Sequence, residues 1–345
     1  MQLIIPAGGL GTRMRPHTYS KPKPLVPVAG KPSIAHILDA LAGLPIDRVV
    51  LITGPRGDML VDYVRAHYPF EVEGVEQKVP NGQSPAIALT EPFITPGADV
   101  FVIFSDTLFV ADFSVLLNLA ADGAGFVQPV PDPSRFGIAV PGADGFLRKL
   151  VEKPKEPESD LAVVGLYYFK SSHMLFDAIR EQIARNIALK NEYFLADAIQ
   201  IMIDHRAKIR VFPVEVWEDT GTIAATLHTN RFFLRRQAAE THAPTAPYIR
   251  GSSLVVPPCH IDPGASLEHS VVGPFASIAA GVRIVHSVVQ DAIVDAKAQI
   301  SGAVLSGSIV GERARVEGGY YSLNIGDDTA VNFGGLSGEI DETFT

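Results

Sequence analysis

Basic side chains follow a glycine-rich turn near the N-terminus, in the stretch LIIPAGGLGTRMRPHTYSKPKPLVP (residues 3–27). Glycines let a backbone approach an anion closely and aim successive N–H groups at it. Arginine adds a bidentate donor for phosphate oxygens, and lysine adds a compact positive charge. The order predicts a buried strand followed by a phosphate-binding loop, with an ordinary turn carrying solvated cations as the alternative. The glycines and cations are Gly8, Gly9, Gly11, Arg13, Arg15, Lys21 and Lys23.

Two aspartates that follow apolar runs could hold a divalent cation. Asp106 ends the run VFVIFSD, and Asp219 lies in VWEDTGT after the run 209–216. An apolar run that ends in aspartate brings a carboxylate to the rim of a sheet. Mg²⁺ prefers oxygen ligands and shares them with phosphates. For either residue alone a turn or helix-capping role is the alternative, and the Thr-Gly-Thr after Asp219 suits that role.

Another charged motif, LVEKPKEPE, contains Glu152 and Lys153 after an apolar run. These two side chains could hold a sugar and its phosphate, although composition alone favours a charged surface loop. Gly137 in SRFGIAV and Gly165 in VVGLYYF are, by themselves, strand glycines. Such glycines often mark the close approach of a ligand or of another chain.

The segments that position these residues alternate between strand-like and helical patterns up to about residue 240. This alternation predicts an α/β layer fold, Rossmann-like, with a mainly parallel sheet. Ligands of such sheets bind outside the carboxyl ends of the strands, where the glycine-rich loop lies if residues 3–6 form a central strand. The expected strands are 3–6, 48–53, 100–104, 124–130, 137–140, 163–169 and 209–216. The expected helices are 33–44, 59–68, 113–121, 172–185 and 192–205.

Beyond about residue 243 the pattern changes to a short repeat. After a proline-rich linker, aliphatic residues recur every five or six positions, with Gly, Ala, Ser and Pro between them. One inward-pointing aliphatic residue per face, with small residues at the corners, is typical of hexapeptide β-helix repeats. An ordinary β-sandwich should alternate over longer strands. We expect a first domain over 1–242, a short left-handed parallel β-helix over 243–320 and an irregular tail over 321–345.

The bulk composition restricts the class of protein. The 345 residues are 47% hydrophobic, which is typical of a globular chain long enough for two domains. The balance of 29 Lys+Arg against 38 Asp+Glu gives a net charge of −9, which argues against general nucleic-acid binding. No apolar stretch could span a bilayer, and the N-terminus lacks the basic region of a signal peptide. With Cys259 as the single cysteine, we expect a cytoplasmic protein without an internal disulfide.

The stretch GGLGTRMRPHTYSKPKPLVPVAGKP resembles the signature of the sugar-1-phosphate nucleotidylyltransferases. The SD, EKP and DTGT motifs follow in the order found in that family, and the similarity covers residues 1 to about 240. It implies an enzyme that joins a nucleoside triphosphate to a sugar 1-phosphate with Mg²⁺. By resemblance the catalytic residues are Arg13, Lys23 and Lys153, and the metal ligands are Asp106 and Asp219. The nucleotide-binding residues are Ala7, Gly8, Gly9, Gly11, Thr12, Gln77, Gly82 and Ser105, and the sugar-phosphate-binding residues are Gly137, Glu152, Gly165 and Trp217.

The resemblance also implies a mechanism. A sugar phosphate is largely dianionic at neutral pH, so its in-line attack on the α-phosphorus needs no general base. The task is to bring two anions together and to neutralise charge. Arg13 would hold the triphosphate and the leaving pyrophosphate, Lys23 would neutralise charge in the transition state, and Lys153 would hold the sugar phosphate. Mg²⁺ on Asp106 and Asp219 would bridge the two substrates.

Base recognition is expected in the segment EQKVPNGQSPA (residues 76–86). Gln77 can offer a donor and an acceptor to a pyrimidine edge, and Gly82 leaves room for the base. The family more often has Gly-Thr-Ala or Gly-Leu-Gly-His-Ala here, so the departure leaves the nucleotide open. A glutamine at this place is similar to thymidylyl- and uridylyltransferases, and this favours dTTP or UTP. Glucose 1-phosphate is the default sugar by resemblance.

Three alternative functions remain open from the sequence. A mannose-1-phosphate guanylyltransferase would share the signature, and a regulatory relative could bind a nucleotide sugar without catalysis. A bifunctional enzyme could transfer acetyl groups on the β-helix with His260, His269 or His286 as the base, although a lone histidine in a repeat is more often structural. We expect the β-helix instead to drive homo-oligomerisation, because its coils leave an edge and an apolar flank that a second copy can cover.

Overall fold

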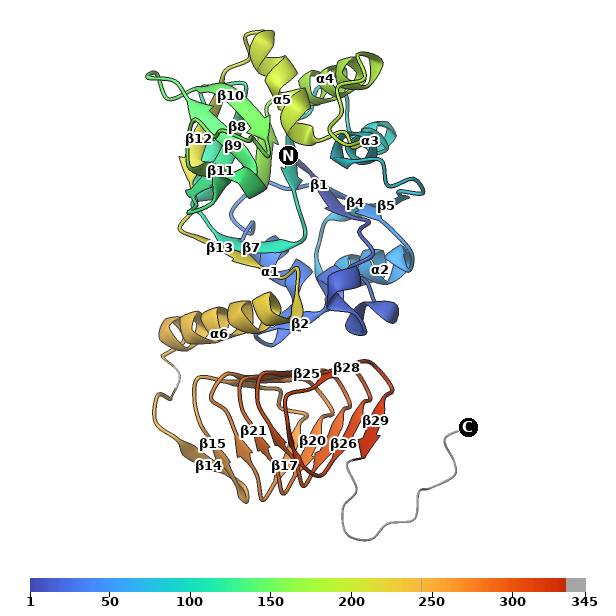
Figure 1. The fold of residues 1–345 in the computed structure, drawn as a ribbon, viewed down its shortest axis with the longest axis vertical. Coiled ribbons are helices and arrows are strands. Elements are labelled where there is room, and N and C mark those ends of the chain that lie inside the picture. The colour runs from blue at the N-terminus through green and yellow to red at the C-terminus, as the bar shows by residue number, and fades with distance from the viewer. Residues whose placement is uncertain (243, 333–345) are drawn as a thin grey trace. The chain divides into compact units, whose positions relative to one another are not determined.

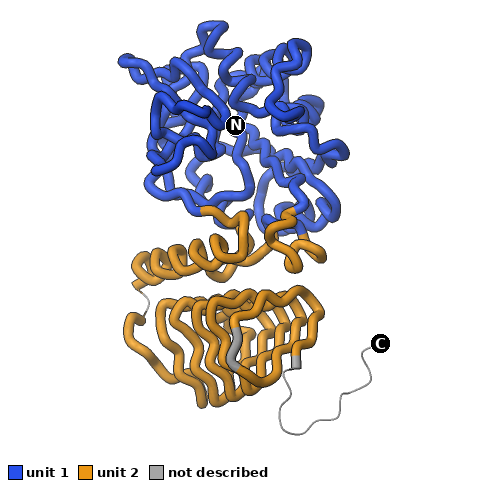
Figure 2. Tube along the Cα trace, viewed as in Figure 1, with its two compact units in different colours: residues 1–10, 22–24, 34–218 blue, residues 11–21, 25–33, 219–345 orange. Residues whose placement is uncertain are grey.

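The computed structural model describes residues 1–242 and 244–332, and the chain divides into two compact units (Figure 2). The division cuts through the glycine-rich N-terminal stretch, whose residues group partly with the first unit and partly with the second. Unit 1 comprises Met1–Leu10, Pro22–Pro24 and Ile34–Glu218, and unit 2 comprises Gly11–Lys21, Leu25–Ser33 and Asp219–Thr345.

A nine-stranded mixed sheet forms the centre of unit 1 (Figure 1). Strand β1 lies between β4 and β6, and β5 flanks β4; all four run parallel. The strands β1, β4 and β6 are almost wholly buried and aliphatic, as expected for strands covered on both faces. The expectation that residues 3–6 form a central strand is confirmed. The bounds are β1 Gln2–Ala7, β4 Arg48–Thr53, β5 Glu71–Glu76 and β6 Val100–Ile103.

The other half of this sheet is built around an antiparallel strand, β11, which pairs with β6, β8 and β9. Its register against β8 shifts between Val163 and Tyr167, and Gly165 there has a φ of +77°. The sheet continues from β9 to β10 and from β8 to β12, and a separate two-stranded ladder joins β7 to β13. The bounds are β7 Thr107–Val110, β8 Gly123–Pro129, β9 Gly137–Pro141, β10 Leu147–Glu152, β11 Leu161–Phe169, β12 Ile209–Pro213 and β13 Val216–Asp219.

Helices complete the α/β arrangement, and three of them, α3, α4 and α5, share one apolar core with the sheet. Ile87 of α3, Ile179 of α4 and Ile199 of α5 are buried in it beside Ile4 of β1. The helices are α1 Ser33–Asp39, α2 Gly57–His67, α3 Gln83–Ala88, α4 Ser172–Ala184, α5 Leu195–Asp204 and α6 Ile223–Glu240. Short 3-10 turns are Thr12–Met14, His17–Tyr19, Lys23–Leu25, Glu91–Phe93, Phe113–Leu116 and Pro133–Arg135.

Four expected helices correspond to α1, α2, α4 and α5, but the helix expected over 113–121 is wrong. Asp112 accepts a hydrogen bond from the Ser114 N–H and starts only a 3-10 turn, and the chain must then enter β8 at Gly123. Helix α6 is long and has no counterpart among the expectations. Its buried face mixes polar and apolar side chains, so the sequence lacks an apolar stripe there. These buried residues are Thr226, Leu227, Thr229, Asn230, Phe233 and Leu234.

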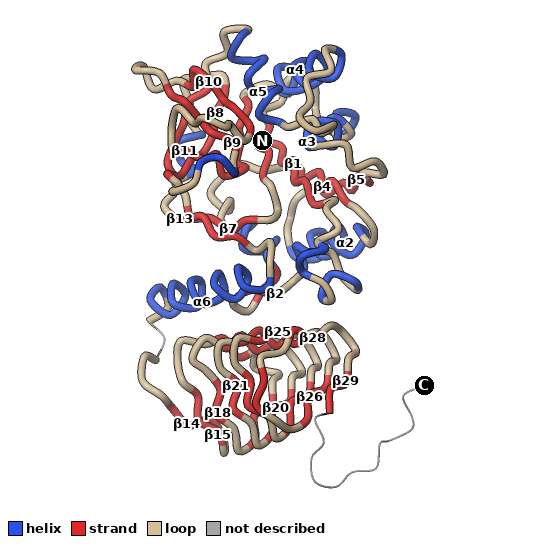
Figure 3. The backbone as a smooth tube through the Cα atoms, viewed as in Figure 1, coloured by secondary structure: helices blue, strands red, loops and turns tan. Residues whose placement is uncertain are grey.

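The C-terminal part of unit 2 consists of short strands in three parallel sheets that repeat along the chain, as a β-helix requires (Figures 1 and 3). Among the described strands of this region, only the first, β14, is antiparallel to its neighbour, β15. The first sheet contains β14 Tyr248–Arg250, β15 Ser253–Val255, β18 Val271–Val272, β21 Val288–Val289, β24 Val304–Leu305 and β27 Tyr320–Tyr321. The second contains β16 His260–Ile261, β19 Ala276–Ile278, β22 Ala292–Val294, β25 Ser308–Val310 and β28 Asn324–Ile325. The third contains β17 Ser266–Glu268, β20 Arg283–Val285, β23 Gln299–Ser301, β26 Arg315–Glu317 and β29 Ala330–Asn332.

The recurring aliphatic residues form the interior of these coils, as the sequence predicts. Val272, Val289 and Leu305 are aligned in register and are fully buried. Buried serines line one corner, where the Ser270 hydroxyl accepts from the Ser287 N–H at 3.1 Å. The strands run on to Asn332, well past the residue at which the sequence analysis places the start of an irregular tail. Residues 333–345 of that expected tail lie outside the described part of the chain.

Within the described ranges, the structure contains no helix that is both long and apolar enough to cross a membrane. The α/β class of the N-terminal domain and the β-helix that follows it are as expected from the sequence.

Candidate active site

The glycine loop of unit 1 follows β1 directly and has one open side. A methyl group at Gly9 would meet nothing within 4 Å. At Gly8 it would lie 3.2 Å from the Thr53 carbonyl oxygen and 3.3 Å from Oε1 of Gln77. A methyl group at Gly54 would lie only 2.5 Å from the Gly8 carbonyl oxygen, so the ends of β1 and β4 approach each other closely. The backbone at Gly9 is therefore accessible to a ligand, while Gly8 lies against its neighbours.

Gln77 follows the end of β5 and faces this loop. Its amide Nε2 donates to the carbonyl oxygens of Val79 and Gly82, both at 3.2 Å. Its Oε1 is the atom that approaches Gly8. The Gln77 amide N–H groups thus bind the backbone of the loop that follows β5. Its amide oxygen is an acceptor beside Gly8.

Backbone packing against Tyr193 requires a glycine at position 82. It has a φ of +123°, and a methyl group there would lie 2.4 Å from the Tyr193 nitrogen and 2.5 Å from the Tyr193 oxygen. The Tyr193 N–H donates to Asn81, and the Ser84 N–H donates back to Tyr193. From the sequence we expect Gly82 to leave room for a base. In the structure, the space that a side chain would need is filled by the Tyr193 backbone.

The end of β6 meets the end of β1 through a serine. The buried Ser105 hydroxyl donates to the Pro6 carbonyl oxygen at 2.7 Å. Asp106, next in the chain, is exposed, and its carbonyl oxygen lies 3.4 Å from Nζ of Lys23. Asp106 and Lys23 therefore lie at the same edge of the sheet as the glycine loop and Gln77.

Glu152 and Lys153 form a pair at the end of β10. Nζ of Lys153 lies 3.0 Å from Oε1 of Glu152 and 4.5 Å from the centre of the Phe194 ring. Lys153 adopts a φ of +45°, and its N–H donates to Phe136 at 2.9 Å. A methyl group at Gly137 would lie 3.0 Å from Oε2 of Glu152, so this glycine leaves space beside the carboxylate.

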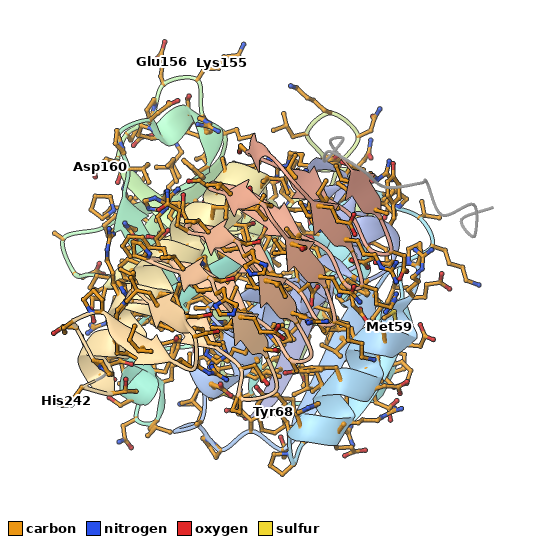
Figure 4. The ribbon with its side chains drawn as sticks, turned by 90° about the horizontal axis from the view of Figure 1, so that it is seen from below. Met59, Tyr68, Lys155, Glu156, Asp160 and His242 are labelled. Carbon is orange, nitrogen blue, oxygen red and sulfur yellow. The ribbon has the colours of Figure 1, made fainter. Side chains whose placement is uncertain are left out.

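The rest of the EKP loop lies apart from this pair. Figure 4 shows Lys155 and Glu156 at its outer end, projecting away from the body of the molecule. Both side chains are exposed. The structure therefore separates the charged residues of LVEKPKEPE into a pair that lies against Phe194 and Gly137 and a solvated tip.

Asp197, in the first turn of α5, was not found from the sequence. Partial burial, with the nearby negative charge of Glu152, raises its pKa to about 6. Burial, again with Glu152, also raises the pKa of Tyr167 well above its usual range. Phe194 and Tyr193 were missed as well. The only signal in the sequence is an aspartate near a helix start, which is too common to indicate a site.

Gly165 and Trp217 are placed by aromatic neighbours. At Gly165 a methyl group would lie 2.9 Å from the Phe104 ring, so the positive φ and the close ring both require glycine. The Trp217 ring lies edge-on to Phe136, with 5.2 Å between centres. Its indole Nε1 is buried and makes no hydrogen bond with any residue in the described ranges. That donor is consequently available to an atom that the chain itself does not supply.

In unit 2, Arg13 and Asp219 face the same small space beside Gly221. A methyl group at Gly221 would lie 2.8 Å from Oδ1 of Asp219 and 3.0 Å from Nη2 of Arg13. The Gly221 N–H donates to Oδ1 of Asp219 at 2.6 Å, and the Thr229 hydroxyl donates to its carbonyl oxygen. Asp219 therefore has the turn role that the sequence suggested as the alternative, and its exposed carboxylate lies beside a guanidinium.

Gly11 and Thr12 shape the segment that carries Arg13. Gly11 adopts the left-handed conformation, with a φ of 59°, immediately before the 3-10 turn Thr12–Met14. The Thr18 hydroxyl donates to the Gly11 carbonyl oxygen at 2.8 Å. This local bond folds the segment back on itself and leaves Thr12 and Arg13 exposed.

Two of the four cations predicted for the phosphate loop have other partners. Nζ of Lys21 lies 2.7 Å from Asp295 and 3.2 Å from Glu312 of the β-helix, and its side chain is only 10% exposed. The Arg15 guanidinium lies over the Tyr19 ring, 4.9 Å from its centre. The prediction of a cradle with four cations is therefore wrong for Lys21, whose charge is already balanced by carboxylates.

These features define a class of protein: an α/β enzyme in which the glycine loop, Lys23 and Asp106, at one sheet edge of unit 1, are suited to phosphate chemistry. The chain belongs to the nucleotidyl transferase family, whose sequence model matches residues 2–236.

Individual relatives agree with this assignment. A glucose-1-phosphate thymidylyltransferase of Streptomyces antibioticus is 31% identical over 94% of this chain and 93% of its own length. A glucose-1-phosphate thymidylyltransferase of Streptomyces griseus is also 31% identical, over 88% of this chain and 89% of its own length. Among solved structures, a Bacillus anthracis protein assigned as a glucose-1-phosphate thymidylyltransferase matches with a TM-score of 0.58. It is 28% identical and covers 67% of this chain and 94% of that chain.

Proposed function

We propose that this chain transfers a nucleotidyl group from dTTP or UTP to glucose 1-phosphate. One observation carries the proposal: the carboxyl ends of β1, β4, β5 and β6 gather an open glycine backbone, Gln77, Lys23 and Asp106 at one sheet edge. Ligands of such sheets bind at this edge. The thymidylyltransferases of Streptomyces, which match nearly the full chain, support the same reaction class.

The reaction is an in-line displacement at the α-phosphorus. An oxygen of the sugar phosphate forms the new bond to the α-phosphorus. The bond between the α-phosphorus and the oxygen that bridges it to the β-phosphorus breaks. Pyrophosphate leaves with the bonding electron pair. Because the attacking phosphate is largely dianionic at neutral pH, no proton has to be removed first.

The chain's own residues supply position and charge for this step. Lys23 neutralises negative charge on the phosphates, and Arg13 holds the triphosphate as a bidentate donor. Lys153 holds the sugar phosphate, oriented by its ion pair with Glu152 and by the Phe194 ring. Such positioning and electrostatic stabilisation dominate phosphoryl and nucleotidyl transfers.

We include Mg²⁺ in the proposal, with Asp106 and Asp219 as the residues that would hold it. The donor set suits the ion, because both side chains are exposed carboxylates and Mg²⁺ prefers oxygen ligands. The described residues contain no group of three or more His, Cys, Asp or Glu side chains arranged for a metal. When bound, the ion would neutralise phosphate charge.

Substrate choice rests on Gln77 for the base and on Glu152 for the sugar. The Gln77 amide oxygen is an acceptor beside Gly8. Its amide nitrogen, which now donates to the carbonyl oxygens of Val79 and Gly82, could donate to a base instead. Glu152 lies beside the space left by Gly137 and can accept from sugar hydroxyls. The indole N–H of Trp217 is a further donor for the sugar phosphate.

Acetyl transfer on the β-helix receives no support from the histidines named for it. The ring of His260 lies against Gly30, where a methyl group would come within 2.5 Å of it. His269 and His286 lie at another corner and stack on each other, with 5.2 Å between centres.

Homo-oligomerisation through the β-helix stays part of the proposal. Light scattering coupled to size exclusion, on the full chain, measures it.

The test is pyrophosphate release with Mg²⁺ across a grid of nucleoside triphosphates and sugar 1-phosphates. We expect the highest rate with dTTP or UTP and glucose 1-phosphate, and its loss in Arg13→Ala. Arg185→Ala, which removes an exposed ion pair with Glu181 on α4, is the matched control and should keep full activity. A folded wild-type protein that releases no pyrophosphate with any pair would contradict the proposal.

A further inference from the structure

The segment between Arg13 and Lys23 is attached to the β-helix by a partly buried ion cluster. Nζ of Lys21 lies 2.7 Å from Oδ2 of Asp295 and 3.2 Å from Oε2 of Glu312. Burial by itself lowers the pKa of Lys21, but the attraction of Asp295, Asp327 and Glu312 outweighs it, so the pKa is raised. Lys21 therefore stays charged, and its charge is directed at carboxylates instead of at a ligand.

The three acidic residues come from the same corner of three successive coils. Asp295 follows β22, Glu312 follows β25, and Asp327 follows β28. They are fixed to the backbone of that corner: the Glu312 N–H donates to Asp327, and the Ala296 N–H donates to Asp295, at 2.8 and 2.7 Å. The acidic cluster thus belongs to one corner of the β-helix. Lys21 enters it from outside the β-helix, and Arg313 pairs with the other carboxylate oxygen of Glu312.

A second anchor lies at residues 15–17. Nε2 of the buried His17 lies 2.5 Å from Oδ1 of Asn324, and Nδ2 of Asn324 donates to the Arg15 carbonyl oxygen at 3.3 Å. A methyl group at Gly326 would lie 2.8 Å from the Pro16 side chain. Asn324 belongs to β28, so the last described coils of the β-helix contact both ends of the 15–21 segment.

Arg13 lies just before these anchors. Its neighbour Met14 is buried and accepts a hydrogen bond from the Thr226 hydroxyl of α6 at 3.4 Å. Nη2 of Arg13 lies beside Gly221, at the start of the same helix. The conformation of the segment that presents Arg13 is thus determined by α6 on one side and by the β-helix on the other.

We propose that Lys21 is a positioning residue that fastens the Arg13-bearing segment to the β-helix, so that triphosphate binding depends on the Asp295–Glu312 cluster. The alternative, that Lys21 itself binds phosphate, conflicts with its surroundings. Two carboxylates within 3.2 Å of its ammonium would repel an incoming anion. The consequence for catalysis rests on the nucleotidyl transfer proposed above.

The experiment compares Lys21→Met and Lys21→Arg with the wild-type full chain. Truncating one partner of a buried ion pair leaves the other charge uncompensated. We expect Lys21→Met to lower kcat/KM for the nucleoside triphosphate about 10-fold or more, with a much smaller effect on KM for the sugar phosphate. Lys21→Arg, which keeps the charge, should recover most of the loss. A residue with a merely structural role would lower thermal stability and leave the kinetic constants of the folded protein unchanged.

Hydrogen exchange on the same proteins separates this inference from the proposed activity. Lys21→Met should speed amide exchange in residues 11–21 and leave β1, β4 and β6 protected as in the wild type. Arg283→Gln, which breaks an exposed ion pair with Glu268 elsewhere on the β-helix, is the control and should change neither readout. If the wild-type protein is inactive, the proposed activity fails while exchange still tests the anchor.

Wild-type-like kinetics and exchange in a folded Lys21→Met protein would overturn the inference. Should Lys21→Met fail to fold, Asp295→Asn and Glu312→Gln test the same cluster from the other side. Each should raise KM for the triphosphate and speed exchange in residues 11–21. Unchanged values in both variants would equally overturn the inference.

Discussion

Nζ of Lys153 lies 3.0 Å from Oε1 of Glu152, in a pair that rests against the Phe194 ring. A cation held by a neighbouring carboxylate and an aromatic face has a restricted range of positions, which favours directional binding of a phosphate. The pair comes from adjacent residues, but the residues that orient it come from β9, β10 and the start of α5. The sugar side of the proposed site is therefore assembled by the sheet and one helix together.

Lys153→Met should lower kcat/KM for glucose 1-phosphate by about 10-fold or more, because a charge-assisted contact is worth roughly 1.5–3 kcal/mol. Steady-state rates with the sugar phosphate varied would measure it. The matched control is Lys155→Met, which removes the same side chain from the solvated tip of the loop (Figure 4). Equal losses in both variants would show that general surface charge, and not the Lys153 contact, affects the rate.

Glycines 9 and 82 should respond differently to the same change. Gly82→Ala should lower the free energy of unfolding by about 2 kcal/mol or more, since its methyl group would lie 2.4 Å from the Tyr193 nitrogen at a positive φ. Gly9→Ala meets nothing within 4 Å and should leave stability within about 0.5 kcal/mol while weakening triphosphate binding. Urea unfolding, with binding measured by calorimetry, separates the two effects. Equal stabilities of the two variants would contradict this account.

Asp197 should make stability depend on pH between about 4 and 6. Its pKa is raised from 3.8 to about 6 in the folded protein, so the folded state binds the proton more tightly than the unfolded state. Stability from this group is present below pH 4 and is lost as pH rises through 6. Asp197→Asn should therefore be more stable than wild type at pH 7.5, by about 1 kcal/mol after allowance for its partial exposure, and should not differ near pH 4.

Urea titrations at both pH values would check the Asp197 prediction. Asp204→Asn, at the other end of α5, serves as the control. The difference in free energy of unfolding between wild type and Asp197→Asn should change between pH 4 and pH 7.5. An equal difference at both pH values would contradict the assigned burial of this carboxyl.

Arg13→Lys tests whether the guanidinium is needed as a bidentate donor. Lysine keeps the charge but cannot form two parallel hydrogen bonds. We expect KM for the triphosphate to rise about 10-fold with folding unaffected, because the Arg13 side chain is exposed. Circular dichroism and initial rates would measure the two properties. Wild-type kinetics in Arg13→Lys would show that only charge matters there.

Local patterns were enough to predict much of the fold. Strand β4 has the predicted bounds, and the β-helix follows from aliphatic residues whose spacing matches its coils. Helix α6 was missed, because its buried face contains Thr226, Thr229 and Asn230. In the full structure these polar groups have partners, such as Asn230 with the Ala29 N–H, which lies about two hundred residues earlier. A window of sequence cannot show such pairing.

The same limit applies to the site. The glycine loop, Gln77 and the EKP pair are recognisable, because their chemistry lies within a few consecutive residues. The position of Lys21 depends on Asp295 and Glu312, which are more than 270 residues away along the chain. Asp197 is likewise defined by its burial and by Glu152, and not by any motif. Long-range partners decide which charged residues face a ligand and which hold the fold.

The most direct test of nucleotidyl transfer follows an isotope. Glucose 1-phosphate labelled with ¹⁸O between C1 and phosphorus is incubated with dTTP or UTP, Mg²⁺ and the full chain, and the products are observed by ³¹P NMR. Attack by a phosphate oxygen on the α-phosphorus predicts a nucleoside-diphosphate sugar that keeps the label between C1 and its phosphorus, together with unlabelled pyrophosphate. A folded protein that forms no such product, or a product that has lost the label, would contradict the account.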